Sequence, residues 1–382
     1  MNCASGALSL PVSDLSASFR PALHRPIALP PLRLTGGLCL RDGAVRRRSL
    51  ALAGGRITKG PLPAVDLDGF LLLPGIVDLG ADPVSDSRAG SPSQRLAAAA
   101  HSAAANGVTT GWLTQGWSSA EGSESPEAAE RLLAAHARER GSPAVDLRLR
   151  LRVETHATDT RDRLLAAIRR YGVDQVVFAD SRGQADAAPA APSAQTRTTS
   201  VPRFLCALAE AFDTMGVTYG SLADPDGETR ERFSMIGAGL ADSPGARSAA
   251  AAAKAMNEPV ILPAASVVSG GPAMSLVGAG LADALRSGPN GRSLLDAVFA
   301  LVDRGWCDLP RAWALVSAGP AAIMGLVDRG TLDHGKRADI VVIDPATRRV
   351  EMTIARGHLT YLGPNAAARL NTAVPGMGLA AE

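Results

Sequence analysis

The chain has 382 residues, of which 46% are hydrophobic and 20% charged, and its formal net charge is +2. This length suits one large α/β domain, and the near-neutral charge gives no support to a nucleic acid or a membrane as the main partner. Four cysteines without regular spacing favour a reducing cytoplasm over a disulfide framework. No run reaches the roughly 20 apolar residues of a membrane span, and the N-terminus lacks the pattern of a secretory signal.

The two ends of the chain predict a small β-domain. Residues 1–27 are expected to form a loose extension. Over residues 28–73, short β-prone pieces alternate with turn signals about every 8–12 residues, which is typical of an antiparallel sheet. The same strand–turn–strand pattern returns over residues 326–366, before a tail at 367–382. We therefore expect the first and last β-prone segments to fold together.

The middle of the chain, residues 74–325, alternates strands with Ala-rich helices. Helices are expected at 93–107, 125–141, 201–216, 291–305 and 309–325. Ser125 is the expected N-cap of the second helix, and residues 183–200 are expected to be a spacer loop. About 250 residues of this pattern predict an α/β fold of the (β/α)8 TIM-like barrel type, with chemistry at the C-terminal strand ends. A doubly wound sheet is the structural alternative, although no GxGxxG or GxxxxGK[ST] motif follows a strand.

Four acidic residues follow predicted strands of this barrel. Asp82 follows GIVDLGA, Glu154 ends DLRLRLRVE, Asp180 follows QVVFA, and Asp224 follows GVTYGSLA. Because parallel strands end at the same edge, we expect these carboxylates to lie near one another at the barrel mouth. They are interpreted either as an oxygen-only site for Mg²⁺ or Mn²⁺ or as solvated and loop-capping side chains.

The strand DLRLRLRVE also carries alternating arginines. Its odd and even positions point to opposite faces, so Arg148, Arg150, Arg152 and Glu154 share one face. Arg152 is expected either to pair with Glu154 or to face a phosphate. His156 is the one histidine near a predicted strand end, and it is a candidate substrate-binding residue or a loop histidine.

Several segments resemble the amidohydrolase superfamily, among them LLLPGIVDL before the barrel and GPAAIMGLVDRGTLDHGKRADIVVID after it. Within that superfamily, ANGVTTGWLTQGWS, LRLRLRVET, VPRFLCALAEAFDTMGVTYGSLADPD and LPRAWALVSAGPAAIMG resemble the alpha-D-ribose 1-methylphosphonate 5-triphosphate diphosphatase family of phosphonate (carbon–phosphorus lyase) metabolism. The resemblance covers most of residues 30–362. It implies a barrel with a split β-domain, and it implies an enzyme that removes pyrophosphate from a ribose 1-phosphonate 5-triphosphate.

The resemblance further implies a divalent metal, but several family ligand positions carry residues that cannot hold one. The family's first-strand histidine corresponds to Gly80, and its other missing ligands correspond to Ser181, Leu222 and Gly288, the last of these following Ser287. Glycine, leucine and serine cannot replace imidazole or carboxylate as metal ligands. The matching acids Asp82, Glu154 and Asp224 are thereby interpreted as degenerate remnants of a catalytic site.

We therefore expect a catalytically impaired family member or a pseudoenzyme that uses no cofactor. Arg152 and His156 are its expected substrate-binding residues, and a small phosphorylated sugar is the expected ligand. An active paralogue or a second copy of the chain is the expected protein partner. The alternative is an active hydrolase of a phosphorylated sugar that holds Mg²⁺ or Mn²⁺, rather than Zn²⁺, in an altered carboxylate site formed by Asp82, Glu154, Asp180 and Asp224.

Overall fold

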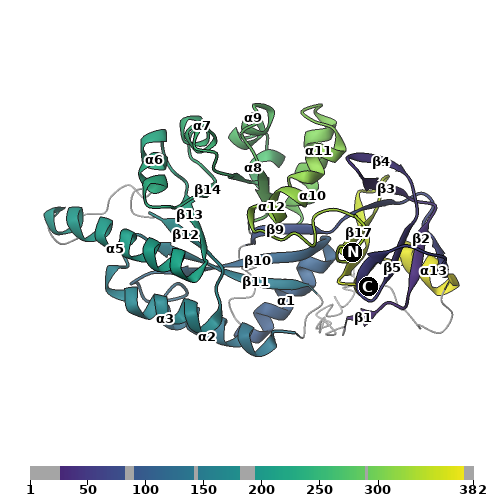
Figure 1. Cartoon of the computed structure of the whole chain (residues 1–382), viewed down its shortest axis with the longest axis horizontal. Coiled ribbons are helices and arrows are strands. Elements are labelled where there is room, and N and C mark those ends of the chain that lie inside the picture. Colours follow the sequence, from purple (N-terminus) through teal and green to yellow (C-terminus); the bar gives the residue numbers. More distant parts are fainter. Residues whose placement is uncertain (1–25, 82–89, 142–144, 181–193, 289–290, 374–382) are drawn as a thin grey trace, which may run out of the picture.

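The computed structural model describes residues 26–81, 90–141, 145–180, 194–288 and 291–373. Its centre is a sheet of eight parallel strands that lie side by side in chain order (Figure 1). They are β9 (Ile76–Ala81), β10 (Val108–Trp117), β11 (Asp146–Glu154), β12 (Gln175–Ala179), β13 (Thr218–Leu222), β14 (Ala241–Asp242), β15 (Val260–Pro263) and β16 (Ala284–Arg286). A bridge between Ala81 and Gly288 brings the two edges together. The predicted (β/α)8 barrel is confirmed, and the doubly wound alternative is wrong.

Helices cover the outside of this barrel. They are α1 (Pro92–Ala105), α2 (Pro126–Glu139), α3 (Arg161–Tyr171), α5 (Ala194–Met215), α6 (Gly227–Met235), α7 (Arg247–Ala255), α8 (Ala264–Val268), α9 (Pro272–Gly278), α10 (Ser293–Asp303), α11 (Leu309–Ala314) and α12 (Ala318–Ile323). Ser125 caps α2 as predicted, because its side chain accepts a hydrogen bond from the Ala128 amide at 3.2 Å. None of the described helices is long and apolar enough to cross a lipid bilayer.

Two helix predictions differ from the structure. Helix α5 begins at residue 194, so the end of the predicted spacer loop is helical and Pro202 lies inside the helix. The predicted helix 309–325 is divided into α11 and α12. The break falls at residues 315–317. Pro320, the third residue of α12, has no amide hydrogen to donate to the carbonyl oxygen of Val316, so one continuous helix through this point is disfavoured.

The two ends of the chain form a small β-domain beside the barrel. A seven-stranded sheet has the order β1-β19-β18-β17-β8-β3-β4 and thus mixes strands from both ends. A four-stranded sheet, β6-β5-β2-β7, comes from the N-terminal part alone. In Figure 1 the purple N-terminal strands lie beside the yellow helix α13 (Pro364–Ala373). The strand bounds are β1 (Ile27–Ala28), β2 (Leu32–Thr35), β3 (Leu38–Arg41), β4 (Ala44–Arg47), β5 (Leu50–Ala53), β6 (Arg56–Thr58), β7 (Ala64–Asp66), β8 (Leu71–Pro74), β17 (Ile340–Asp344), β18 (Arg349–Ala355) and β19 (His358–Leu362).

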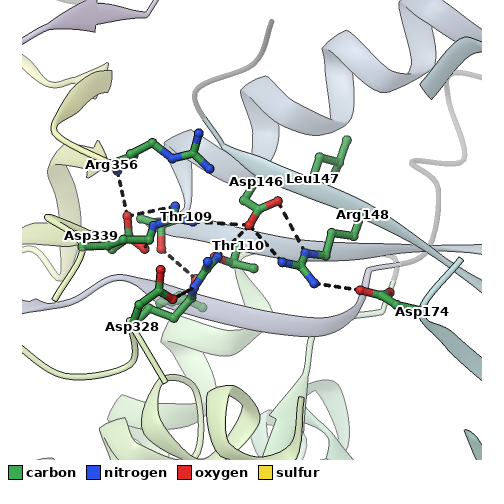
Figure 2. Close-up of polar contacts among 12 residues, drawn as sticks. Thr109, Thr110, Asp146, Leu147, Arg148, Asp174, Asp328, Asp339 and Arg356 are labelled. Carbon is green, nitrogen blue, oxygen red and sulfur yellow. Dashed lines mark hydrogen bonds and ion pairs between the residues drawn. The ribbon is translucent and has the colours of Figure 1, made fainter. Parts of the chain in front are cut away.

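An ion-pair network joins the start of β11 to the segment that leads into β17 (Figure 2). Asp146 Oδ2 accepts hydrogen bonds from Arg329 Nη1 at 2.7 Å and from Arg337 Nη1 at 3.4 Å. Arg148 lies against Asp146 and also donates to Asp174 at 2.7 Å. Partial burial opposes ionisation, but Arg148 and Arg329 lower the pKa of Asp146 to about 2. We call this cluster of Asp146, Arg148, Asp174, Arg329 and Arg337 the base network.

Candidate functional site

The two faces of β11 have opposite environments. Leu149, Leu151 and Val153 are buried in the apolar core that contains Leu132 and Leu133 of helix α2. The alternate positions carry the arginines and Glu154, so the predicted alternation is present. This arrangement brings a row of cations to the barrel side of the strand.

Arg150 lies in the interior of the barrel. Its side chain is 1% exposed, and its guanidinium donates to Thr114 Oγ1 at 2.9 Å, to the Leu79 carbonyl oxygen at 2.9 Å and to Asp242 Oδ2 at 2.8 Å. Asp242 is fully buried, and its Oδ1 accepts from Arg286 Nε at 2.7 Å. Burial opposes ionisation of Asp242, but Arg286 and Arg150 lower its pKa to about 2. We call Arg150, Asp242 and Arg286 the central ion cluster.

Gly80 faces this cluster. A Cβ atom on Gly80 would lie 2.8 Å from Arg150 Cζ, closer than real Cβ atoms approach other heavy atoms. The backbone of β9 bulges at this point, since Asp78 pairs with Gly111 but Ala81 pairs with Leu113. The guanidinium therefore fills the space into which a side chain at position 80 would project.

The seam between β9 and β16 is held by a buried carboxyl group. Asp78 Oδ1 accepts from the backbone amides of Gly80 and Ser287, each at 3.1 Å, and Oδ2 accepts from Ser287 Oγ at 2.5 Å. Burial raises the pKa of Asp78, and the hydrogen bonds from Ser287 lower it only in part. The Gly288 amide completes the seam by donating to the Gly80 carbonyl oxygen at 3.1 Å. Asp78 and Ser287 thus close the barrel.

Arg152 and Glu154 occupy the end of the same strand. Arg152 forms an ion pair with Glu124, which lies just before helix α2, and their side chains are 31% and 43% exposed. Arg152 was expected to pair with Glu154 or to face a phosphate. In the structure its partner is Glu124, which was not predicted. Glu154 itself is buried, with 8% exposure.

His156 and Asp180 lie together where β11 and β12 end. Their side chains are hydrogen-bonded, with 2.8 Å between His156 Nε2 and Asp180 Oδ1. Both line a pocket of about 600 Å³ that also includes Leu222 and Asp224. The structure thus brings three of the residues singled out from the sequence, His156, Asp180 and Asp224, to one cavity.

Asp224 serves a structural role within that cavity wall. Ala223 has a positive φ of 62°, and the Asp224 side chain is 2% exposed. Its Oδ2 accepts from Ser221 Oγ at 2.6 Å and lies 3.4 Å from Nη1 of the fully buried Arg230. Arg230 also donates to the backbone carbonyl oxygens of Ala238 and Leu240. The carboxylate is therefore occupied in fixing helix α6 against the barrel.

The described residues at the barrel centre do not fit the divalent metal that the resemblance implies. Both oxygens of Asp242 accept hydrogen bonds from guanidinium groups, and a divalent cation beside Arg150 and Arg286 would be repelled by both. Within the described ranges, no three His, Cys, Asp or Glu side chains are gathered as a metal-binding group. Asp82 and Ser181 lie outside those ranges, so the four-carboxylate site stays a prediction.

The central ion cluster and the Ser221–Arg230 contacts were not predicted from the sequence. A signal for the first was present, because Arg150 occupies the middle of the alternating strand and Gly80 leaves room opposite it. No comparable signal marks Asp242, which lies in a strand of two residues. Its role depends on the pairing of β14 with β13 and β15.

Part of the sequence is similar to that of a curated protein. Over 116 residues the chain is 36% identical to the alpha-D-ribose 1-methylphosphonate 5-triphosphate diphosphatase of Escherichia coli (strain K12). The match covers 28% of this chain and 31% of that protein, so the chain spans about a third of the length of this relative in the alignment. No protein-family model matches the sequence.

Solved structures share the fold over nearly the whole chain. A D-hydantoinase from Bacillus sp. AR9 has a TM-score of 0.63 at 13% identity and covers 86% of this chain and 94% of its own. A putative prolidase from Bifidobacterium longum has a TM-score of 0.63 at 15% identity, with 91% and 99% covered. A Xaa-Pro dipeptidase with bound methionine has a TM-score of 0.63 at 16% identity, with 87% and 100% covered. The predicted resemblance is thereby confirmed: the chain has the barrel fold of amidohydrolase-family hydantoinases and prolidases, and part of its sequence is similar to that of the ribose methylphosphonate triphosphate diphosphatase.

Proposed function

We propose that this chain is a non-hydrolytic relative of the ribose methylphosphonate triphosphate diphosphatase. The observation that carries the proposal is the placement of Arg150, which is 1% exposed, paired with Asp242 and packed against Gly80. Metal-dependent hydrolysis needs an ion that lowers the pKa of a bound water. A guanidinium carries donors only and stays protonated, so it can neither bind a metal nor accept a proton from water.

Ligand or partner binding is the function left to such a protein. Arg152 and His156 are partly exposed at the end of β11 and offer a cation and an imidazole to a small phosphorylated sugar. An active paralogue, or a second copy of this chain, is the protein partner that we propose, and the cytoplasm is the proposed location. These assignments extend the sequence resemblance to a diphosphatase.

The decisive experiment measures pyrophosphate release from ribose 1-methylphosphonate 5-triphosphate. The purified chain is assayed with Zn²⁺, Mn²⁺, Fe²⁺ or Mg²⁺, beside the Escherichia coli diphosphatase as a positive control. Loss of even one catalytic contact commonly costs about a hundredfold in rate, so the loss of several is expected to leave release at the blank level. The Glu154→Gln variant should give the same blank value. Release by the unmodified chain that this variant abolishes would contradict the proposal.

A hydrolase with an altered site is the second candidate function. The observation in its favour is the 2.8 Å hydrogen bond between His156 and Asp180, because a carboxylate can orient an imidazole that accepts a proton. The same assay separates the two candidates. A working His156–Asp180 pair predicts pyrophosphate release that His156→Gln abolishes and that added metal does not change.

A further inference from the structure

The pocket beside His156 lies away from the barrel centre. It is enclosed by the ends of β12 and β13 together with helices α5 and α6, and it contains none of the three residues of the central ion cluster. Phe178, one of its lining residues, points to the helical side of β12, because it packs with Phe212, Tyr219 and Phe233 in the core beneath the helices. The pocket therefore lies between the strand ends and the helical layer, outside the central ion cluster.

The walls of this pocket are mainly apolar. Phe178 and Phe233 contribute a pair of near-parallel rings, with centroids 6.1 Å apart and planes inclined by 17°. Leu205, Leu222 and Ile236 supply aliphatic surface around them. A volume of about 600 Å³ lies within the range of ligand sites, which are mostly apolar with a few placed polar groups. Aromatic walls of this kind favour an occupant with an aromatic ring, which can stack or meet the rings edge to face.

Two of the three acidic or arginine side chains that line the pocket, Asp224 and Arg232, are ion-paired within the protein. Asp224 is compensated by the buried Arg230, while Asp180 is bonded to His156. Arg232 is ion-paired with Glu228 on the exposed side of helix α6. A charged ligand entering the apolar part would lose hydration. An anion would in addition face the Asp180 carboxylate, and a cation would have to displace the His156 partner of that carboxylate. An uncharged occupant is therefore favoured, in contrast to the phosphorylated sugar proposed for the strand end.

His156 supplies the polar recognition. The Asp180 carboxylate accepts a hydrogen bond from His156 Nε2, so in a neutral ring Nδ1 is the hydrogen-bond acceptor. We infer that the pocket between α5 and α6 binds an uncharged aromatic molecule whose hydroxyl or N–H group donates to His156. Phenols and arylamines belong to this class. The inference goes beyond the proposed function, since it concerns a different ligand chemistry. The two share His156, whereas Arg152 does not line this pocket.

Binding of N-phenyl-1-naphthylamine tests the inference, because this fluorescent probe is uncharged, aromatic and carries one N–H group. Cys206 lines the pocket from α5 and Thr229 lines it from α6, so Cys206→Phe and Thr229→Phe fill the cavity from opposite sides. Arg203→Phe is the matched control, because Arg203 is exposed on α5 and does not line the pocket. We expect saturable binding to the full-length chain, at least tenfold weaker binding to both filled variants, and unchanged binding to the control.

A charged analogue and a variant of the polar group complete the test. The sulfonate of 8-anilinonaphthalene-1-sulfonate adds a negative charge to nearly the same arylamine, and it should bind at least tenfold more weakly. His156→Phe should weaken binding of the uncharged probe several-fold, since it removes the acceptor and keeps the ring. Circular dichroism at 222 nm establishes that each variant is folded. Equal binding by the filled variants and the unmodified chain, tighter binding of the sulfonate, or absence of saturable binding would each overturn the inference.

Discussion

Two arginines of the same strand lie in ion clusters of different kinds. Arg150 belongs to the central ion cluster, where its side chain is 1% exposed and that of Asp242 is fully buried. Arg148, two residues earlier, belongs to the base network, where its side chain is 27% exposed and that of Asp146 is 22% exposed. Neighbouring arginines lower the pKa of both aspartates to about 2, so the two pairings are similar in strength. The clusters differ in how far water reaches them.

This difference assigns the two clusters different roles. Water reaches Asp146 and Arg148 of the base network. Arg329 and Arg337 are nearly buried, but each has a further carboxylate partner, Asp328 and Asp339 respectively, so the network can lose Asp146 at a smaller cost. In the barrel interior water does not reach a charge that has lost its partner. Removing one member of the central ion cluster is therefore expected to destabilise the fold strongly. At the centre of the barrel the Asp242 carboxylate is already neutralised by Arg150 and Arg286, so binding of an added cation is unfavourable there.

Removing the carboxylate of the central cluster should have the largest effect. Asp242→Asn leaves two guanidinium groups around one neutral amide, and breaking a buried pair in this way commonly costs about 3–5 kcal/mol. Asp146→Asn in the base network should cost about 1–2 kcal/mol, because water reaches this site. Urea unfolding followed by circular dichroism measures both free energies.

A double variant sharpens this comparison. Arg150→Leu together with Asp242→Leu removes the pair and keeps Arg286, whose side chain is 13% exposed and also donates to Ser243. Replacing a buried pair by apolar residues is often neutral, so the double variant should be more stable than Asp242→Asn. Equal losses for Asp242→Asn and Asp146→Asn would refute the distinction between the clusters.

The barrel was predictable because its strands and helices carry local signals. Alternating leucines and arginines in β11, Ser125 before α2, and the Ala-rich segments are properties of short windows. Helices α6 and α7 were missed, as was β14, which pairs over only two residues on each side. Its position is set by its neighbours in the barrel rather than by its own sequence.

The candidate site was predictable only in part. His156 and Asp180 were singled out separately because each follows a strand, but their hydrogen bond depends on loop conformation. Asp224 was interpreted either as a ligand of a carboxylate metal site or as a degenerate remnant or loop-capping side chain. In the structure it follows Ala223, which has a positive φ, and pairs with the buried Arg230. Arg230 lies nine residues after Ser221, on helix α6, and no sequence pattern distinguishes it from the other charged residues of that helix. Its contact with Ser221 could therefore not be predicted from the sequence.

Restoring a histidine at position 80 should have an intermediate effect. Gly80→His places a side chain against Arg150, since even a Cβ atom would lie 2.8 Å from its Cζ. Overpacking of a buried site typically costs about 1–3 kcal/mol, and this cost should appear as a lower urea midpoint. The variant should bind no Zn²⁺ in a dialysis assay, because Arg150 and Arg286 remain in place.

The combination Gly80→His with Arg150→Ala separates crowding from other causes. Removing the guanidinium opens space for the imidazole, so the double variant should recover part of the loss even though Asp242 keeps only Arg286. Ala for Gly111 serves as a milder control for adding a side chain, because this glycine also lies on a barrel strand and its Cβ would meet the nearest atom, Val108 Cγ1, at 3.3 Å. Stoichiometric Zn²⁺ binding by Gly80→His alone would show that the cluster can yield to a metal.

The smallest expected effect concerns acid and salt. Both Asp146 and Asp242 have a folded-state pKa of about 2, below the ordinary value of 3.8 for an aspartate. Each therefore stabilises the fold above about pH 4, and this contribution is lost as the pH falls towards 2. For Asp146 the contribution is at most about 2 kcal/mol, reduced by partial exposure. Asp146→Asn should therefore show a flatter dependence of unfolding free energy on pH between 5 and 2.

In 1 M NaCl the difference in unfolding free energy between Asp146→Asn and the unmodified chain should shrink, because salt screens partly exposed pairs. The loss in Asp242→Asn should persist. A salt response that is the same for both variants would mean that water reaches the two clusters alike.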